Sequence, residues 1–220
     1  MLGLDPATLI SRIVVLLTAF SVHEFAHAWT ANYFGDNTPR YNGRLTLNPL
    51  AHLDVMGSLM LLFAGFGWAK PVPVNPYVLQ RRSPSALMWV SLAGPLSNFF
   101  MALLAAIPFR LNLVTASQAI TDAYSGSSSF LPTVPQLLWE FITINLLLML
   151  FNLIPLAPLD GEKILDFVLP PSIRNIFDTI RPYGPIILLV LLFGLPYIGI
   201  DVIGSIIRPP LFYLTMLLTG

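Results

Sequence analysis

Two histidines and a glutamate stand close together near the start of the chain, in the order His23-Glu24-Phe25-Ala26-His27. Residues four apart lie on one face of a helix, so both imidazoles can bind one metal ion. The glutamate beside the first histidine can take a proton from water at that ion, as in zinc hydrolases. A chance match in a chain with three histidines is expected roughly once in two thousand. The motif therefore predicts one Zn²⁺ per chain, with Glu24 as general base.

A catalytic zinc site needs a third protein ligand and one position left for water. Asp160 is favoured by its context, because Pro155 and Pro158 break the preceding helix and place a carboxylate where the chain re-enters water. The alternative is an Asp-Gly turn that merely ends the helix. The other candidate ligands are His52, Asp54, Glu140, Glu162 and Asp166.

The composition indicates that a membrane surrounds these residues. Hydrophobic residues make up 55% of the 220 and charged residues only 10%, with eleven basic side chains balancing eleven acidic ones and no cysteine. The mean hydropathy is +0.75. These values exclude a disordered chain, a nucleic-acid-binding protein and most soluble domains. They predict an all-α polytopic membrane protein whose surroundings are a lipid bilayer.

Apolar stretches of about 20 residues predict the membrane-spanning helices. We expect a single integral membrane domain over 1–220, with its core at 9–165. Three stretches qualify in full: 9–33, 86–109 and 137–156.

Two further C-terminal helices are expected at 183–200 and 202–218, which gives about four to six transmembrane helices in all. Arg208, Pro209 and Pro210 predict that the last of them is broken or interfacial. The short, Gly-rich region 53–76 predicts a small re-entrant or β-hairpin element between the first two spans.

Basic residues indicate the orientation in the membrane. They occur in 35–85 and 160–182 and are absent from 111–136, so the first two regions are predicted to be cytoplasmic. His23, His27 and Asp160 would then lie at a similar depth near the cytoplasmic ends of their spans.

The two ligand motifs, in this order, resemble those of the site-2 protease family of intramembrane zinc metalloproteases. The second motif reads Asn152-x-x-Pro155-x-x-x-x-Asp160-Gly161. Segments at 43–54, 67–74 and 93–98 are also similar to that family, and the resemblance covers roughly residues 15 to 165. It is closest to a short form with no preceding span, no PDZ domain and no C-terminal regulatory domain, which suggests the plasma membrane of a prokaryote.

The resemblance implies a function and a set of roles. His23, His27 and Asp160 would bind zinc, and Glu24 would activate water. Asn152 matches the family's motif asparagine, which implies a hydrogen bond to the scissile carbonyl or its oxyanion. The expected partner is a transmembrane protein or peptide substrate, cleaved in or near its membrane segment.

Three further residues are candidates for substrate binding. Val72 and Val74 lie in a Pro-Val-Pro-Val run that could form an edge strand and pair with an extended peptide, or a hairpin without such a role. Asn98 belongs to a stripe of small residues at helical spacing in the second span, which consists of Ser91, Gly94, Asn98 and Ala102. The stripe predicts helix packing, and Asn98 itself could contact substrate or support the zinc site.

Two other functions use the same His and Glu cluster. A proton-coupled transporter could employ it as a relay, although no inverted pair of broken helices is visible in the sequence. A non-catalytic membrane scaffold could keep the motif to hold a client helix, but it would have no need of Glu24.

Overall fold

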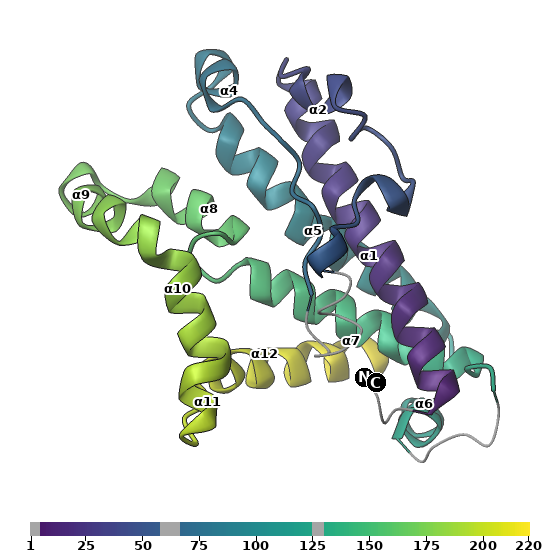
Figure 1. Cartoon of the computed structure of the whole chain (residues 1–220). Helices are drawn as coiled ribbons and strands as arrows, with labels where there is room; N and C mark the ends of the chain where they lie inside the picture. Colours follow the sequence, from purple (N-terminus) through teal and green to yellow (C-terminus); the bar gives the residue numbers. More distant parts are fainter. Residues whose placement is uncertain (1–4, 58–66, 125–129) are drawn as a thin grey trace.

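The structure is a computed structural model that describes residues 5–57, 67–124 and 130–220, and its regular elements are helices (Figure 1). In chain order these are α1 (Pro6–Tyr33), α2 (Thr38–Tyr41), η1 (Pro49–Ala51), α4 (Pro76–Arg82), α5 (Ala86–Arg110), α6 (Ala116–Tyr124), α7 (Val134–Asn152), α8 (Asp160–Val168), α9 (Pro171–Ile180), η2 (Arg181–Tyr183), α10 (Gly184–Leu189), η3 (Val190–Gly194), α11 (Leu195–Tyr197) and α12 (Val202–Thr219).

Local sequence explains where the long helices begin. The Asp5 carboxylate accepts a hydrogen bond from the Thr8 N–H at 3.1 Å, and a proline follows at the first position of α1. Thr133 does the same for α7, where its hydroxyl accepts from the Gln136 N–H at 3.2 Å. At 1.5 Å per residue, the 28 residues of α1 and the 19 of α7 are long enough to cross or nearly cross a hydrocarbon core of about 30 Å.

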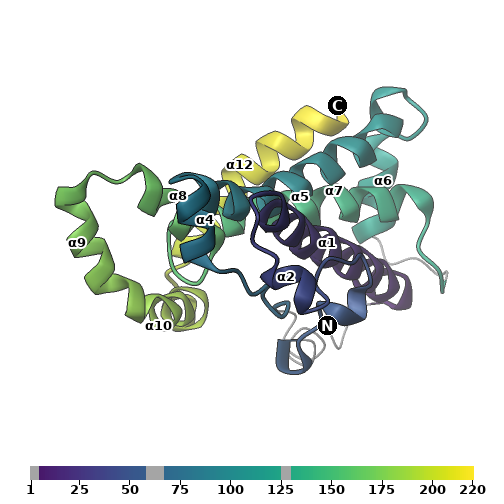
Figure 2. The same ribbon diagram turned by 90° about the horizontal axis from the view of Figure 1, so that it is seen from above.

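Helix α5 contacts both α1 and α7, and Figure 2 shows these three helices as neighbours. The contact with α7 buries Ala102, Ala105 and Ala106 against Ile142 and Leu146. Small side chains let two helix backbones approach closely. Lipid is as apolar as the helix surfaces, so the van der Waals contacts of this close approach contribute strongly to helix association. The small-residue stripe of α5 therefore does pack against neighbouring helices, as its spacing predicts.

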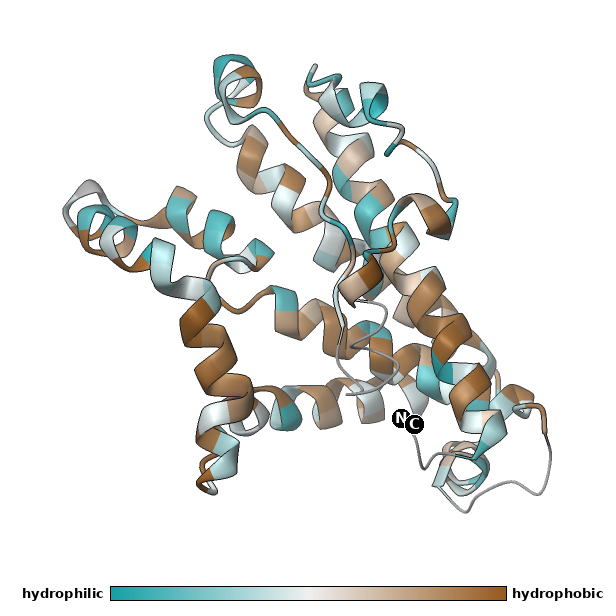
Figure 3. Ribbon diagram, viewed as in Figure 1, coloured by the Kyte–Doolittle hydropathy of each residue, from teal (hydrophilic) through white to brown (hydrophobic). Residues whose placement is uncertain are grey.

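Five helical segments are long and apolar enough to span a membrane: Pro6–Tyr33, Ala86–Arg110, Val134–Asn152, Ser172–Tyr197 and Val202–Thr219. This confirms the predicted all-α polytopic class. The first three form the packed core, whereas only 6% of the apolar window of Ser172–Tyr197 is buried. Figure 3 shows α10, within that segment, as a strongly hydrophobic and largely separate rod, which suits contact with lipid.

The predicted break in the last helix is wrong. Helix α12 runs without interruption through Pro209 and Pro210. The charge of Arg208 is neutralised locally, because its guanidinium donates to the Asp201 carboxylate. Asp201 also caps the helix by accepting from the Gly204 N–H at 2.8 Å. The two prolines each remove one N–H donor from the helix without ending it.

The predicted hairpin between 53 and 76 is present only as one antiparallel bridge between Leu53 and Ala69. Its central part, 58–66, lies outside the described residues. After the bridge, the Lys70 N–H donates to the His52 carbonyl at 2.8 Å, and the chain continues as an extended trace over 70–75 (Figure 1). No strand ladder forms there among the described residues, since Pro71 and Pro73 have no N–H to donate.

Candidate metal centre

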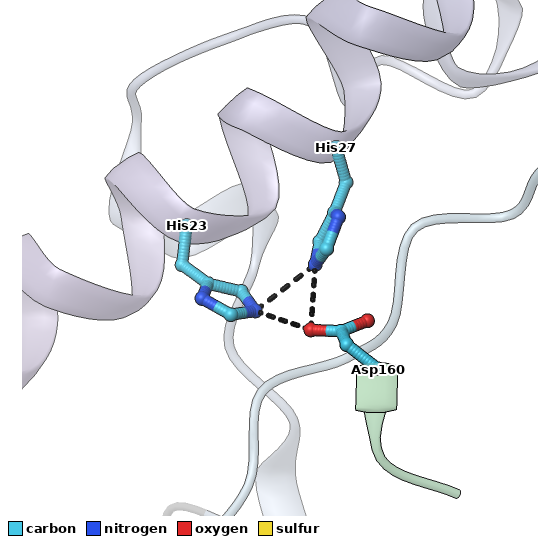
Figure 4. A group of neighbouring side chains, drawn as sticks. All are labelled: His23, His27 and Asp160. Carbon is cyan, nitrogen blue, oxygen red and sulfur yellow. Dashed lines mark hydrogen bonds and ion pairs between the residues drawn. The ribbon is translucent and has the colours of Figure 1, made fainter. Parts of the chain in front are cut away.

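Three side chains that could bind a metal converge at one point between α1 and α8 (Figure 4). The Nε2 atoms of His23 and His27 lie 3.0 Å apart. Oδ2 of Asp160 lies 3.2 Å from each of them. The two histidines project from one face of α1, and the aspartate is the first residue of α8. The four-residue spacing of the histidines thus brings both imidazoles to one point, as the motif predicts.

These atoms have the spacing that zinc requires. Three ligands at the usual zinc distances on a tetrahedral ion are about 3.3 Å from one another. The observed separations of 3.0–3.2 Å are close to that value. Two neutral imidazoles and one carboxylate are also a known catalytic zinc donor set, with a fourth position left for water. The residues present therefore fit one Zn²⁺.

The ring nitrogens that face away from this point are hydrogen-bonded. Nδ1 of His23 lies 2.6 Å from Oδ1 of Asn98, and Nδ1 of His27 lies 2.7 Å from the Val90 carbonyl oxygen. Both partners are acceptors, so each imidazole donates its Nδ1–H. The lone pair is then on Nε2, the atom that points to the convergence point. Such contacts fix the tautomer and the ring orientation of a metal ligand.

The contact of His23 continues as a chain of buried amides through the bundle. Asn98, which is fully buried in α5, donates from its side-chain nitrogen to Oδ1 of Asn145 at 2.8 Å. Asn145 in turn donates to the Phe141 carbonyl at 2.8 Å. Both polar groups of Asn98 are thereby engaged behind the histidine. This position favours support of His23 over direct contact with substrate.

Close packing places Asp160 against the histidines. After Asn152 the chain turns sharply and re-enters helix at Asp160. A Cβ on Gly161 would collide with the carbonyl groups of Leu153 and Ile154, so only glycine allows this approach. Oδ2 of Asp160 faces both Nε2 atoms, so this oxygen can share one metal ion with the two imidazoles.

Gly94 makes the approach of α5 possible from the other side. A Cβ at this position would collide with Nε2 of both His23 and His27. Gly94 belongs to the small-residue stripe of α5, whose spacing predicts a close approach of helices, although it does not predict that the approach is to these two imidazoles.

Glu24 lies at the edge of the same site. Its Oε2 accepts a hydrogen bond from the Val72 N–H at 3.1 Å, which joins α1 to the 70–75 segment. A cavity of about 160 Å³ adjoins these groups. It is lined by all three candidate ligands, by Glu24 and by Pro71, Val72, Val74, Leu87, Val90, Ser91, Asn152, Pro158 and Lys163.

The side chain of Asn152 reaches this cavity from the last turn of α7. Its Nδ2 donates to the Leu148 carbonyl at 3.0 Å. Val72 and Val74, the predicted substrate-binding residues of the 70–75 segment, line the cavity as well.

Lys163 also lines the cavity, although in the sequence it stands out only as one of the basic residues that indicate orientation. Its place three residues after Asp160 is a signal that it shares a helix face with that carboxylate.

The other candidate third ligands lie elsewhere with partners of their own. His52 contacts the Thr46 carbonyl through Nε2 at 2.8 Å, and Asp54 accepts from the Gly57 N–H at 2.8 Å. The carboxylates of the remaining candidates pair with arginines: Glu140 with Arg12, Glu162 with Arg181, and Asp166 with Arg174 and Arg181. Within the described part of the chain, Asp160 alone among the six candidates joins the two histidines.

Two histidines and a glutamate lie on a helix of membrane-spanning length, and a carboxylate from α8 meets the histidines at one point. This arrangement defines a membrane protein with the donor set of a zinc hydrolase. Comparison with protein families gives the same answer, because residues 11–194 match peptidase family M50. The chain belongs to this family and is a zinc metalloendopeptidase. The predicted resemblance to the site-2 proteases is confirmed, and neither the transporter nor the scaffold alternative gains support.

Bacterial proteins show the same relationship. YwhC of Bacillus subtilis, named "Putative zinc metalloprotease", is 39% identical over 179 residues, which cover 81% of this chain and 78% of YwhC. Rip2 of Mycolicibacterium smegmatis, with the same description, is 30% identical over 186 residues, or 80% of this chain and 64% of Rip2. Rip2 of Mycobacterium tuberculosis is 29% identical over 185 residues, or 80% and 63%. No solved structure matches the chain.

Replacement of Asp160 should remove the metal. In Asp160→Ala we expect zinc affinity to fall by at least about 100-fold, because two imidazoles alone leave a catalytic zinc site one protein ligand short. The measurement is zinc per chain in detergent-purified protein, with Asp54→Ala as the matched control. One zinc in both variants would place the third ligand elsewhere.

Gly94→Ala should also lose zinc while keeping all three ligands. The added methyl group overlaps both imidazoles, so the rings must rotate away from Asp160. We expect a zinc affinity at least about tenfold below that of the wild type. Gly194→Ala is the control, because a Cβ there makes only an ordinary contact of 3.5 Å with Val190. Equal zinc affinity in the two variants would contradict this packing.

Asn98→Leu should weaken zinc without abolishing it. Leucine keeps the volume but leaves the Nδ1–H of His23 without an acceptor, and loss of such a contact usually costs 10- to 100-fold in affinity, with about tenfold as the minimum expected here. Competition with a zinc chelator measures the change, and Asn42→Leu at an exposed position provides the comparison. An unchanged affinity would show that Asn98 does not orient His23.

Proposed function

We propose that this zinc metalloprotease hydrolyses peptide bonds in or near the transmembrane segments of other membrane proteins. The observation that carries the proposal is the position of the candidate centre. His23, Glu24 and His27 all lie within α1, a 28-residue helix of membrane-spanning length, and all are buried. Ionisable groups inside a membrane are costly, so their presence there favours chemistry at membrane depth.

His23, His27 and Asp160 are the proposed ligands, with one zinc per chain. When bound there, zinc would supply Lewis acidity to water and to a peptide carbonyl. Glu24 is the proposed general base. Because the Val72 N–H holds one oxygen of its carboxylate, the other is available to accept a proton from water and to return it to the leaving amine nitrogen.

Asn152 is the proposed donor to the scissile carbonyl oxygen. It lines the cavity from α7, and Glu24 lines the same cavity from α1. Its amide nitrogen donates one hydrogen to the Leu148 carbonyl, and the NH₂ group retains a second. A donor aimed at the oxygen on which charge develops stabilises the transition state more than the ground state.

The 70–75 segment could bind the substrate in a locally unwound, extended conformation. A transmembrane helix has its backbone groups already hydrogen-bonded, so a protease must receive it locally unwound. Val72 and Val74 line the cavity in an extended stretch that has no ladder partner among the described residues. We infer that an extended peptide pairs with this edge, which compensates the backbone bonds lost on unwinding.

A second cavity supports access from within the membrane. It has a volume of about 580 Å³ and lies between α1, α7 and α12. Its walls include Phe20, one turn before His23, and Phe151, next to Asn152. This apolar space could receive the side chains of a membrane segment beside the candidate centre. The loops that adjoin the centre carry most of the basic residues, so we place the centre toward the cytoplasmic side.

Glu24→Gln tests the proposal. The variant should keep its zinc, because glutamine has nearly the same shape, but should cleave at least about 10³-fold more slowly because the general base is lost. The probe is a pool of synthetic peptides, each a transmembrane segment of about 20 residues with its polar flanks. Mass spectrometry identifies the products in detergent micelles.

The peptide pool also includes soluble segments of equal length as the matched comparison. Cleavage of membrane segments by the wild type, absent in zinc-loaded Glu24→Gln, would support the proposal. Equal cleavage by both proteins would remove Glu24 from the mechanism. Cleavage restricted to the soluble segments would overturn the intramembrane substrate.

A further inference from the structure

One cation faces the cavity of the candidate centre. Lys163 lies on α8 three residues after Asp160, so the two side chains share a face of the helix. The lysine is partly buried and lines the same cavity of about 160 Å³ as the three candidate ligands. No arginine or other lysine lines this cavity in the part of the chain that the structure describes.

The nearby carboxylates are already engaged. On α8 itself, Glu162 and Asp166 both pair with Arg181. Within the cavity, Asp160 contacts the two histidines, and Glu24 accepts from the Val72 N–H. Among the described residues no carboxylate forms an ion pair with Lys163. A partly buried ammonium without a counter-ion is an unfavourable arrangement that an incoming anion would relieve.

We propose that Lys163 selects the cleavage site, by pairing with an aspartate or glutamate side chain of the substrate close to the bond that is cut. This inference rests on the proposed protease function and names a sequence preference within it. The lysine is a specificity residue in this scheme, because its ammonium contacts a substrate side chain and takes no part in proton transfer.

The size of the cavity limits where that acidic residue can be. A space of about 160 Å³ is about 7 Å across if roughly spherical, and an extended peptide advances about 3.3 Å per residue. The lysine side chain and the candidate ligands face this one space. The acidic residue should therefore lie within about two positions of the cleaved bond.

The first test maps cleavage positions in the peptide pool described above. For the wild type we expect aspartate and glutamate to be enriched within two positions of the cleaved bonds, by about tenfold over their frequency in the pool. Lys163→Gln should lose this enrichment while still cleaving other peptides. Lys163→Glu should favour lysine and arginine instead. Lys163→Arg should retain the acidic preference, and Arg40→Gln, at an exposed cation that does not line the cavity, should leave it unchanged.

The second test measures binding without cleavage. In the zinc-loaded Glu24→Gln protein, a fluorescent pool peptide with one glutamate in its membrane segment should bind about tenfold more tightly than the same peptide with glutamine at that position. Adding Lys163→Gln should make the two peptides bind equally. Zinc per chain is measured for every variant, so a variant that fails to fold is recognised by its lost metal.

The outcomes separate the two proposals. Wild-type protein that cleaves no peptide would contradict the proposed function, and the binding measurement would still decide the role of Lys163. Cleavage with no acidic preference, or a preference that survives in Lys163→Gln, would overturn the inference about Lys163. Equal slowing of acidic and neutral peptides in Lys163→Gln would overturn it as well, since the lysine would then act on the reacting oxygen.

Discussion

The hydrogen bond between His23 and Asn98 joins the candidate metal centre to the framework of the protein. In a bilayer a polar group must find its partner within the protein, because lipid offers none. The chain from His23 through Asn98 and Asn145 to the Phe141 carbonyl crosses α1, α5 and α7. Sliding any of these helices by one turn would leave buried amides unpaired. The same contacts that orient an imidazole therefore also fix the register of three spans.

Much of this arrangement can be predicted from sequence because its signals are local. The spacing of His23 and His27 determines a shared helix face, and the apolar stretches determine the three core spans within a few residues. The prolines before Asp160 predict a break that the structure shows, since α7 ends at Asn152 and α8 begins at Asp160. Spacing, the prolines and the predicted orientation together favour the grouping of His23, His27 and Asp160 that the structure shows.

The remaining features depend on contacts between residues distant in sequence. The Val90 carbonyl beside His27 and the Val72 N–H beside Glu24 have no local signature in the sequence. The last helix was expected to break because Arg208 and two prolines read as unfavourable in lipid. The Asp201 carboxylate, seven residues and about two helical turns earlier, neutralises that charge.

One ion-pair cluster connects the lipid-facing part of the molecule to the centre. Arg181, where α9 meets η2, pairs with Glu162, Asp166 and Asp178. Glu162 is two residues after Asp160 on a helix that also packs against α5. These ion pairs therefore hold the weakly packed segment Ser172–Tyr197 against α8, the helix that supplies the third candidate ligand. Several ion pairs in one partly exposed cluster can stabilise the position of this segment, whereas a single exposed ion pair would contribute little to stability.

The Pro-Val-Pro-Val run has two unlike edges. In an extended chain, alternate backbone groups point to opposite sides. The N–H of Val72 points toward Glu24, and the N–H of Val74 lies on the same side. The opposite side belongs to Pro71 and Pro73, which present carbonyl oxygens and no donors. This outer edge can accept hydrogen bonds but cannot donate them, which protects it against pairing with other strands.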